Sequence, residues 1–174
     1  MASPRESRGS DTTRLIRWHF APFAKLTPQQ VHDLYRLRVH VFIVEQDCVF
    51  QDVDGVDPQC WHLLGYGDRS QSGEGRDLSS DELVAYCRFV PPGIKFTEAS
   101  IGRVITAPSV RGTGMGRVLM AEAMKRAREL WPGQALRIGA QAHLERFYNG
   151  FGFTKSSEPY DEDGILHIEM ENEQ

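Results

Sequence analysis

The sequence predicts an α/β domain with a mixed sheet, and two kinds of periodicity support that fold class. Runs of strand length that are rich in apolar residues span residues 15–20, 61–66, 83–90, 100–106 and 136–140. Two longer stretches, after Thr27 and after Gly114, repeat apolar residues at helical spacing. Because strands and helices alternate along the chain, an α/β architecture is expected. The 174 residues suffice for one domain with a sizeable core, which we place at residues 14–174.

The first helix is predicted from Pro28 to near Val44. Thr27 can cap its N-terminus, Pro28 suits the first helical position, and Gln30 completes a capping box. The apolar stripe of this helix runs through Leu34, Leu37 and Val41.

The second half of the chain predicts a longer helix and a closing group of short elements. Apolar residues share one face from Gly114 to Leu130, and the Trp-Pro-Gly sequence at 131–133 ends the helix. After the strand at 136–140 we expect a short helix at 143–149, a turn at 150–152, and strands near 153–157 and 165–171.

Charge and composition argue against several functional classes. The net charge is −4 and the pI about 5.9, whereas a general nucleic-acid binder carries a basic face. No apolar run approaches the roughly 20 residues that span a bilayer, so we expect neither a nucleic-acid nor a membrane partner. The cysteines are odd in number and form no C-x-x-C motif, so we expect reduced thiols in the cytoplasm. They are Cys48, Cys60 and Cys87.

Three segments are predicted to be irregular. We expect a disordered leader at 1–13 and a mobile, polar Gly/Ser-rich loop at 68–82. The acidic loop at 45–60 looks at first like a calcium loop. However, Gly55 stands at the fourth place counted from Asp52, whereas the calcium loop needs glycine at the sixth. We therefore expect no metal site.

The stretch RGTGMGRV at residues 111–118 joins a predicted strand to a predicted helix. It fails the dinucleotide fingerprint, because Arg117 stands where the last glycine should be, and no Gly-Lys-Ser/Thr follows as in the triphosphate loop. A helix N-terminus carries unpaired N–H groups and about half a positive charge, and glycines let an anion approach them closely. Arg111 and Arg117 add positive charge, so the loop predicts a pyrophosphate site.

Two motifs in this order resemble those of the GNAT superfamily of N-acetyltransferases. The first, R-x-x-G-x-G at 111–116, resembles the acetyl-CoA loop of that family. The second, F-Y-x-x-x-G-F at 147–153, resembles the family's Leu/Phe-Tyr-x-x-x-Gly-Phe element. The segments VFIVEQDCVFQDVDGVD, GRVI and GAQAHLERFY are also similar to the bacterial ElaA-like branch of the superfamily.

The resemblance implies the GNAT acyl-CoA N-acyltransferase fold, a central mixed sheet flanked by helices and splayed between its fourth and fifth strands. The pantetheine arm of acetyl-CoA would enter the gap between the strands at 100–106 and 136–140. Gln141 stands where many family members have an asparagine that bonds this arm. The cofactor-binding residues implied are Val104, Ile105, Thr106, Arg111, Gly112, Thr113, Gly114, Met115, Gly116, Arg117, Gln141 and Tyr148.

The reaction implied by the resemblance is direct acetyl transfer from acetyl-CoA to a primary amine, with Tyr148 as the general acid. An amine of pKa about 10.4 must first lose a proton, which costs roughly 4.6 kcal/mol at pH 7, so a base is expected. Three candidates remain open: Glu45 after the first helix, His62 at the start of a strand, and His143 near the short helix. Backbone N–H groups near Ile105 are expected to stabilise the oxyanion.

Acidic residues crowd two loops, of which the resemblance places the first on the acceptor side. If both loops line the site, they attract a cationic amine such as a polyamine, an aminosugar or a basic peptide terminus. These residues are Asp47, Asp52, Asp54 and Asp57 in one loop, and Glu158, Asp161, Glu162 and Asp163 in the other.

Other functions fit parts of the sequence. A CoA-binding sensor or interaction module without turnover would keep the same glycine loop. The R-x-x-V-F pattern at 38–42 matches the start of the acyl-homoserine-lactone synthases, although it fixes few positions. The resemblance also leaves a homodimer open, because GNAT domains often pair.

Overall fold

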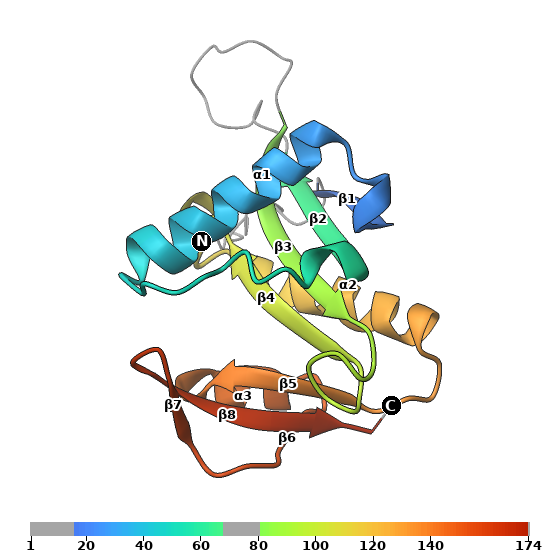
Figure 1. Ribbon diagram of the computed structural model, residues 1–174, viewed down its shortest axis with the longest axis vertical. Coiled ribbons are helices and arrows are strands. Elements are labelled where there is room, and N and C mark those ends of the chain that lie inside the picture. The colour runs from blue at the N-terminus through green and yellow to red at the C-terminus, as the bar shows by residue number, and fades with distance from the viewer. Residues whose placement is uncertain (1–15, 68–80, 174) are drawn as a thin grey trace, which may run out of the picture.

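A computed structural model of the protein describes residues 16–67 and 81–173 (Figure 1). The expected leader at 1–13 and most of the expected loop at 68–82 lie outside the described residues. The described residues form two sheets with helices packed on them. Within these ranges, no helix has both the length and the apolar character to cross a bilayer.

The first sheet contains the strands up to residue 106, in the order in which they follow along the chain. Each strand pairs antiparallel with the next, so that Phe20 faces Leu63 and Leu63 faces Cys87. The strands are β1 (Ile16–Pro22), β2 (Trp61–Gly67), β3 (Glu82–Val90) and β4 (Ser100–Thr106). All of these strands were predicted from the sequence, with ends that differ by about two residues.

The second sheet is built around the C-terminal strand β8 (Ile165–Asn172). One edge of β8 pairs with β5 (Leu136–Gln141), and the other pairs with β6 (Thr154–Lys155) and β7 (Tyr160–Glu162). The expected strands near 136–140, 153–157 and 165–171 are therefore present. Strand β7 was not predicted.

The two sheets meet at one end of the gap between β4 and β5. Ala99 forms a parallel bridge with Leu136, and the Arg137 N–H donates to the Ala99 carbonyl at 2.9 Å. Beyond this point the two strands diverge (Figure 1). The expected mixed arrangement, splayed between the fourth and fifth strands, is confirmed.

Helix α1 (Pro28–Arg38) begins with the expected capping box. The Gln30 N–H donates to Thr27 Oγ1 at 3.2 Å, and the Thr27 N–H donates to Gln30 Oε1 at 2.8 Å. The helix continues as a π-helix at Val39–Glu45, in which the Gln46 N–H donates to the Val41 carbonyl at 3.3 Å. The predicted extent is confirmed, and the π-helical turns set which side chains of its end face the site.

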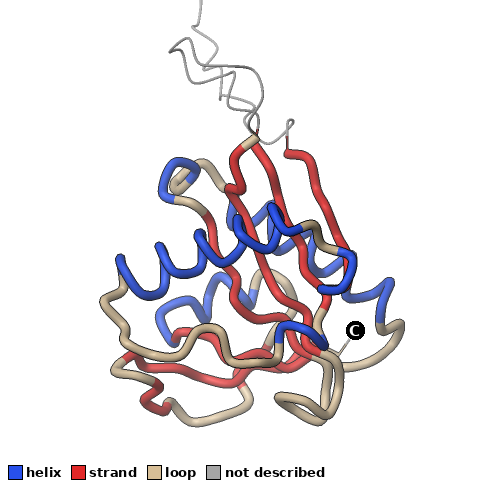
Figure 2. The backbone as a smooth tube through the Cα atoms, turned by 45° about the horizontal axis from the view of Figure 1, so that its top comes forward, coloured by secondary structure: helices blue, strands red, loops and turns tan. Residues whose placement is uncertain are grey.

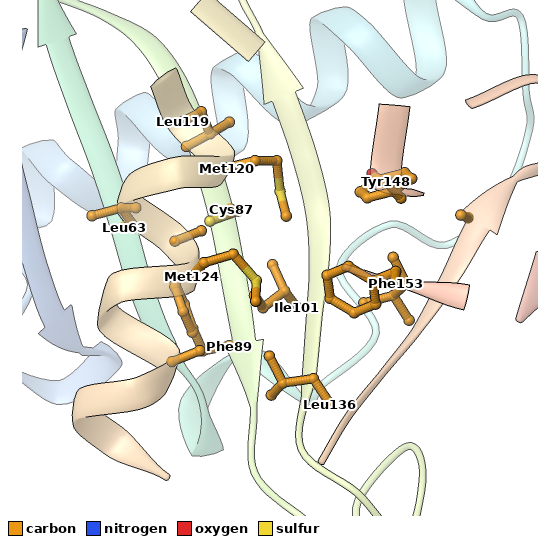
Figure 3. Packing of buried hydrophobic residues seen from close by; sticks show 14 of the residues in the cluster. Leu63, Cys87, Phe89, Ile101, Leu119, Met120, Met124, Leu136, Tyr148 and Phe153 are labelled. Atoms are coloured by element: carbon orange, nitrogen blue, oxygen red, sulfur yellow. The ribbon is translucent and has the colours of Figure 1, made fainter. Parts of the chain in front are cut away.

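The remaining helices are α2 (Met115–Leu130) and α3 (Glu145–Asn149), the latter preceded by a 3₁₀ turn at Ala142–Leu144. Alternation along β3 sorts its side chains between α1 on one face and α2 on the other (Figure 2). Tyr86 packs on the α1 side, whereas Cys87 and Phe89 pack on the α2 side. Figure 3 shows Tyr148 and Phe153 joining this second core beside Ile101 and Met120.

Candidate active site

A cleft of about 730 Å³ lies along the gap between β4 and β5. Its walls are β4 from Ser100 to Thr106 and, across the gap, β5 from Gly139 to Gln141. The end of the π-helix, Tyr148 of α3 and the turn between β7 and β8 complete the lining. Of the residues implied as binding the cofactor, the cleft is lined by Val104, Ile105, Thr106, Arg111, Gln141 and Tyr148.

Strand β4 bends where it lines the cleft. Tyr86 faces Ile105 and Arg88 faces Gly102, so β4 carries an extra residue against β3, which is a β-bulge. Arg103 lies in the bulge with a φ of 51°, in the left-handed region. The bulge directs the Arg103 guanidinium to Asp52, where Nε donates to Oδ1 at 2.8 Å.

The edge of β4 that faces the gap offers unpaired backbone groups. The Ala107 N–H donates to the Val84 carbonyl at 2.8 Å, so these residues form a hydrogen-bonded pair of the antiparallel ladder. Because such pairs alternate, Ile105 bonds to β3, while the Thr106 N–H and carbonyl point into the gap. The Thr106 carbonyl accepts a bond from Arg111 Nη2 at 3.3 Å, which leaves the Thr106 N–H for a ligand.

The glycine loop lies at the N-terminus of α2, beyond the lining of the cleft. Gly112 and Gly114 have φ values of 76° and 89°, a region that favours glycine. A Cβ atom on either residue would meet nothing within 4 Å. Gly114 is the N-cap of α2 and no side chain caps the helix, so the N–H groups of Met115 and Gly116 are open to an anion, whereas that of Arg117 donates to the Gly114 carbonyl at 3.0 Å.

Glu45 lines the cleft at the end of the π-helix, and both of its carboxylate oxygens have partners. Arg111 Nη2 donates to Oε2 at 2.7 Å, and His40 Nε2 lies 3.4 Å from Oε1. The Arg111 charge, which was expected to face a pyrophosphate, is therefore compensated by Glu45. Arg117 is exposed near the start of α2.

His62 is not brought to the cleft. Its side chain is fully buried, with Nε2 3.1 Å from the Asp57 carbonyl and Nδ1 2.8 Å from Tyr86 Oη. Because a carbonyl only accepts, Nε2 carries the proton and Nδ1 accepts from the tyrosine. Burial lowers the pKa of His62. Both nitrogens are thus occupied inside the protein, and neither faces an acceptor in the cleft.

Tyr148 reaches the cleft from α3, and the exposed His143 lines it from the preceding turn. Tyr148 is 7% exposed and packs edge-on against Phe147 and Phe153. Within the described ranges, its hydroxyl has no hydrogen-bond partner. Burial raises the pKa of Tyr148 to about 12, so the hydroxyl stays protonated at neutral pH and is available as a donor.

A closed ring of ion pairs anchors the acidic loop to the first sheet. Its members, in order around the ring, are Arg38, Asp52, Arg103, Asp54, Arg88 and Asp57. Each arginine contacts two of the aspartates, and Arg38 and Asp57 are 0% and 1% exposed. The expectation that the three ring aspartates attract a cationic acceptor is therefore wrong, because the arginines compensate their charges.

The turn between β7 and β8 supplies the remaining acidic groups of the cleft. Glu162 and Asp163 both line it, and within the described ranges neither has an arginine or lysine at salt-bridge distance. Asp163 also accepts, through its carbonyl, a bond from Cys48 Sγ at 3.4 Å. This contact joins the acidic loop of the first sheet to the hairpin of the second sheet across the cleft.

Comparison with known proteins identifies the family. Residues 79–174 match the family described as an acetyltransferase (GNAT) domain. ElaA of Escherichia coli is 38% identical over 161 residues, which cover 91% of this chain and 97% of ElaA. The chain belongs to the GNAT family of acetyltransferases. A UPF0039 protein of Synechocystis is 41% identical over 155 residues, which cover 89% of this chain and 94% of that protein.

Solved GNAT structures share the fold described above. The crystal structure of Escherichia coli ElaA superimposes with a TM-score of 0.79 at 37% identity and covers 91% of this chain and 100% of ElaA. An acyl-CoA N-acyltransferase from Pseudomonas aeruginosa gives a TM-score of 0.79 at 36% identity, covering 90% and 99%. The protein is therefore a GNAT enzyme of the acyl-CoA N-acyltransferase type. Among residues 16–67 and 81–173, no group of His, Cys, Asp or Glu side chains is arranged to hold a metal ion.

The GNAT cleft contains a histidine that the sequence analysis did not single out. His167 of β8 faces Gln141 of β5 in register and lines the cleft. A signal for it exists in the sequence: Asp163-Gly164 is a typical two-residue hairpin turn, and it sets which face each β8 residue occupies. The φ values of these two residues, 53° and 82°, are those that such a turn requires.

Proposed function

We propose that the protein acetylates a primary amine of a small molecule or peptide, with acetyl-CoA as donor and a cationic acceptor such as a polyamine or aminosugar. The observation that carries this proposal is the meeting of Tyr148 and the gap edge of β4 on one cleft. A hydroxyl can donate to a leaving sulphur, and backbone N–H groups can hold a developing oxyanion. These are the donors that acyl transfer to an amine requires.

The start of α2 and the gap edge of β4 are suited to hold acetyl-CoA. The uncapped N–H groups at Gly114 and beyond would hold the pyrophosphate, with Arg117 adding charge. The Thr106 N–H would pair with the pantetheine arm, and Gln141 would offer a side-chain amide from the opposite wall. Because Arg111 bonds Glu45, we assign it to holding the π-helix beside the loop rather than to neutralising phosphate.

Acidic groups on the far wall support a cationic acceptor. Glu162 and Asp163 lie at the hairpin turn, and within the described ranges neither has an arginine or lysine at salt-bridge distance, although Lys95 of the same cleft interacts with Glu162 through its charge. They would attract an ammonium ion and raise its local concentration. They would also favour its protonated form, so a base beside them is needed before the nitrogen can attack.

Buried thiols support the cytoplasm as the location. Cys48, Cys60 and Cys87 are free and buried. Burial raises the pKa of Cys60 to about 11 and also raises that of Cys87, so both remain protonated and unreactive. Free thiols of this kind are typical of proteins that reside in a reducing compartment.

The substitution Tyr148→Phe tests the proposal. It removes the hydroxyl and keeps the packing of the ring, so we expect kcat to fall about 100-fold while acetyl-CoA affinity stays near that of the unmodified protein. The assay follows thiol release from acetyl-CoA with a polyamine, an aminosugar and a dipeptide amide as acceptors. Tyr66→Phe is the matched control, because it deletes a tyrosine hydroxyl that bonds Asp33 outside the cleft.

Two outcomes would contradict the proposal. If Tyr148→Phe turns over as fast as the unmodified protein, Tyr148 is not the donor to the leaving group. If the unmodified protein binds acetyl-CoA tightly but releases no thiol with any amine, the alternative of a CoA-binding module without turnover is favoured.

A further inference from the structure

We propose that His167 is the general base that deprotonates the acceptor amine, a role that rests on the proposed function. His167 lies on β8 directly opposite Gln141 of β5, and its side chain lines the cleft. The imidazole is 15% exposed, so it is accessible to a ligand and still held in one place.

The hydrogen bonds of His167 fix which ring nitrogen is basic. Nδ1 lies 2.8 Å from the Ile165 carbonyl, which can only accept, so in the neutral ring Nδ1 carries the proton. Nε2 therefore bears the lone pair. Within the described ranges Nε2 has no partner, which leaves its lone pair free to take a proton from a ligand.

The neighbours of His167 favour the charged form that proton transfer would create. Glu162 Oε2 lies 3.8 Å from Nδ1, and the Tyr160 ring stacks on the imidazole with centroids 6.1 Å apart. The Ile165 carbonyl accepts the Nδ1–H bond, and the Glu162 carboxylate, at 3.8 Å, stabilises the imidazolium through its charge rather than through a hydrogen bond.

The other ionisable groups on this face of the second sheet are Glu169 and Glu171 of β8, both paired with Arg137 of β5. Lys95, from the loop between β3 and β4, also reaches this face near Gly139.

His167 and Tyr148 lie towards opposite faces of the second sheet. Tyr148 packs with Ile168 and Met170, whose side chains leave the core-facing side of β8. His167 alternates with these residues and so leaves the other side. An amine adds to the face of a thioester while the leaving sulphur lies in its plane, so the base and the proton donor approach the carbonyl carbon from different directions. A donor on the core side and a base on the outer side match that requirement.

The other candidates for the base are less suited by geometry. Both oxygens of Glu45 have partners in Arg111 and His40, and both nitrogens of His62 are occupied within the core. His143 lines the cleft, but no described carboxylate is at salt-bridge distance from its ring. His167 combines a fixed tautomer, a free Nε2 and a carboxylate beside Nδ1.

The reaction then balances in protons and bonds. His167 Nε2 takes one proton from the acceptor ammonium and later gives it to solvent. The freed nitrogen bonds to the thioester carbonyl carbon, and the C–S bond breaks. Tyr148 gives a proton to the sulphur, and the second proton lost by the nitrogen restores the Tyr148 hydroxyl. The products are the acetylated amine, CoA as a thiol, and one proton in solvent.

Two probes that differ in basicity test the role. Spermidine is protonated at pH 7 and needs the base, whereas hydroxylamine is largely unprotonated and does not. We expect His167→Gln to lower kcat/KM about 100-fold with spermidine, and by no more than about threefold with hydroxylamine. His32→Gln, which changes an exposed histidine of α1 outside the cleft, is the matched control.

A second variant separates the base from a merely structural histidine. His167→Asn keeps an amide that can donate to the Ile165 carbonyl and removes the basic nitrogen, so it should show the same split between the two probes. Glu162→Gln should lower the rate with spermidine and leave the rate with hydroxylamine nearly unchanged, because the imidazolium loses the nearby negative charge. Equal losses with both probes, or an unchanged rate with spermidine, would overturn the assignment.

One measurement does not depend on the acceptor at all. Diethyl pyrocarbonate modifies accessible, unprotonated histidine nitrogens, and mass spectrometry locates the modified residues. We expect His167 to react and acetyl-CoA to slow its modification, while the buried His62 stays unmodified. If His143 reacts and His167 does not, His167 offers no free nitrogen to the cleft. If no amine is acetylated although His167 reacts, the proposed function is contradicted, and with it the role of His167 as base, while the free nitrogen in the cleft is confirmed.

Discussion

At the scale of single residues, Gly152 shows why the FYNGFGF segment needs glycine in its turn. Its φ is 84°, and a Cβ atom there would lie 2.7 Å from Asn172 Nδ2. The Asn172 amide cannot move freely, because it is buried and donates to the Phe151 carbonyl at 3.0 Å. The glycine thus lets the turn close against β8 and holds α3, with Tyr148, over the cleft.

This contact predicts the effect of Gly152→Ala. The substitution adds a left-handed backbone cost of about 1 kcal/mol and also breaks the Asn172 bond, at about 1–2 kcal/mol more. Urea unfolding measures the sum. Gly133→Ala is the control for the backbone cost alone, because Gly133 has a φ of 69° and open space around it. If both variants lose the same free energy of unfolding, the Asn172 side chain can move away from the new methyl group without a loss of stability.

Residues within short motifs were predictable, whereas residues joined across the fold were not. The glycine loop and Tyr148 could be recognised from the sequence, because each belongs to a motif of residues that are close together along the chain. His167 needs the register of β8 against β5, and the aspartates of the ion-pair ring need partners from strands far away in sequence. Pattern and spacing carry no information on such pairings, so the loop at 45–60 read as an acidic surface.

At the scale of elements, the ion-pair ring ties α1, the acidic loop, β3 and β4 into one unit. Arg38 comes from α1, Arg88 from β3 and Arg103 from the bulge of β4, while the aspartates come from the loop. The Arg103 guanidinium also lies over the Phe42 and Phe50 rings, at 5.8 and 5.4 Å from their centroids. The ring therefore sets the wall that an acceptor meets.

Removing one carboxylate from the ring is expected to be costly. Asp57→Asn keeps the shape of the side chain but leaves Arg38 and Arg88 without a full counter-charge in a buried place. We expect the free energy of unfolding to fall by about 3–5 kcal/mol, measured by urea denaturation at pH 7. Asp47→Asn, an exposed aspartate of the same loop outside the ring, is the control and should change little.

The ring also predicts how stability depends on pH. Burial alone would raise the pKa of Asp54 and Asp57, but the bonds and charges of Arg38, Arg88 and Arg103 hold both below the usual range. As the pH falls, these two carboxylates are protonated in the unfolded chain before they are protonated in the folded protein. The contribution of the ring to the free energy of unfolding is therefore present above about pH 4 and is lost as the pH falls further. The Asp57→Asn variant should lose less between pH 5 and 3, which the same titration of unfolding measures.

Two elements of the structure were not predicted from the sequence, because they are too short to show a periodic pattern. Strand β7 is polar and only three residues long, so it has no periodicity to detect. Its existence follows from the Asp163-Gly164 turn, which pairs it with β8. The π-helical end of α1 was likewise invisible, because the same apolar spacing suits an α-helix and a π-helix over so few residues.

At the scale of the whole molecule, the site is a gap between two sheets that contact each other at both ends of the gap. The Ala99–Leu136 bridge closes one end, and the Cys48–Asp163 contact spans the other. Between these points β4 presents free backbone groups to the cleft, since no strand pairs with its gap edge in the described residues. An unpaired strand edge offers its N–H and C=O groups to another extended chain or to a ligand that pairs in the same way.

Hydrogen exchange measured by NMR tests this view of the gap. If the pantetheine arm adds to β4 as an extra strand would, saturating acetyl-CoA should slow exchange of the Thr106 amide at least about tenfold. The Ile105 amide is the internal control, because it already bonds to β3 and should change little. Protection at the start of α2 without any at Thr106 would mean that the phosphates bind while the arm takes another path. Equal protection of Thr106 and Ile105 would instead indicate that the ligand stabilises the whole sheet, and the alternation of bonds along β4 would no longer explain where acetyl-CoA lies.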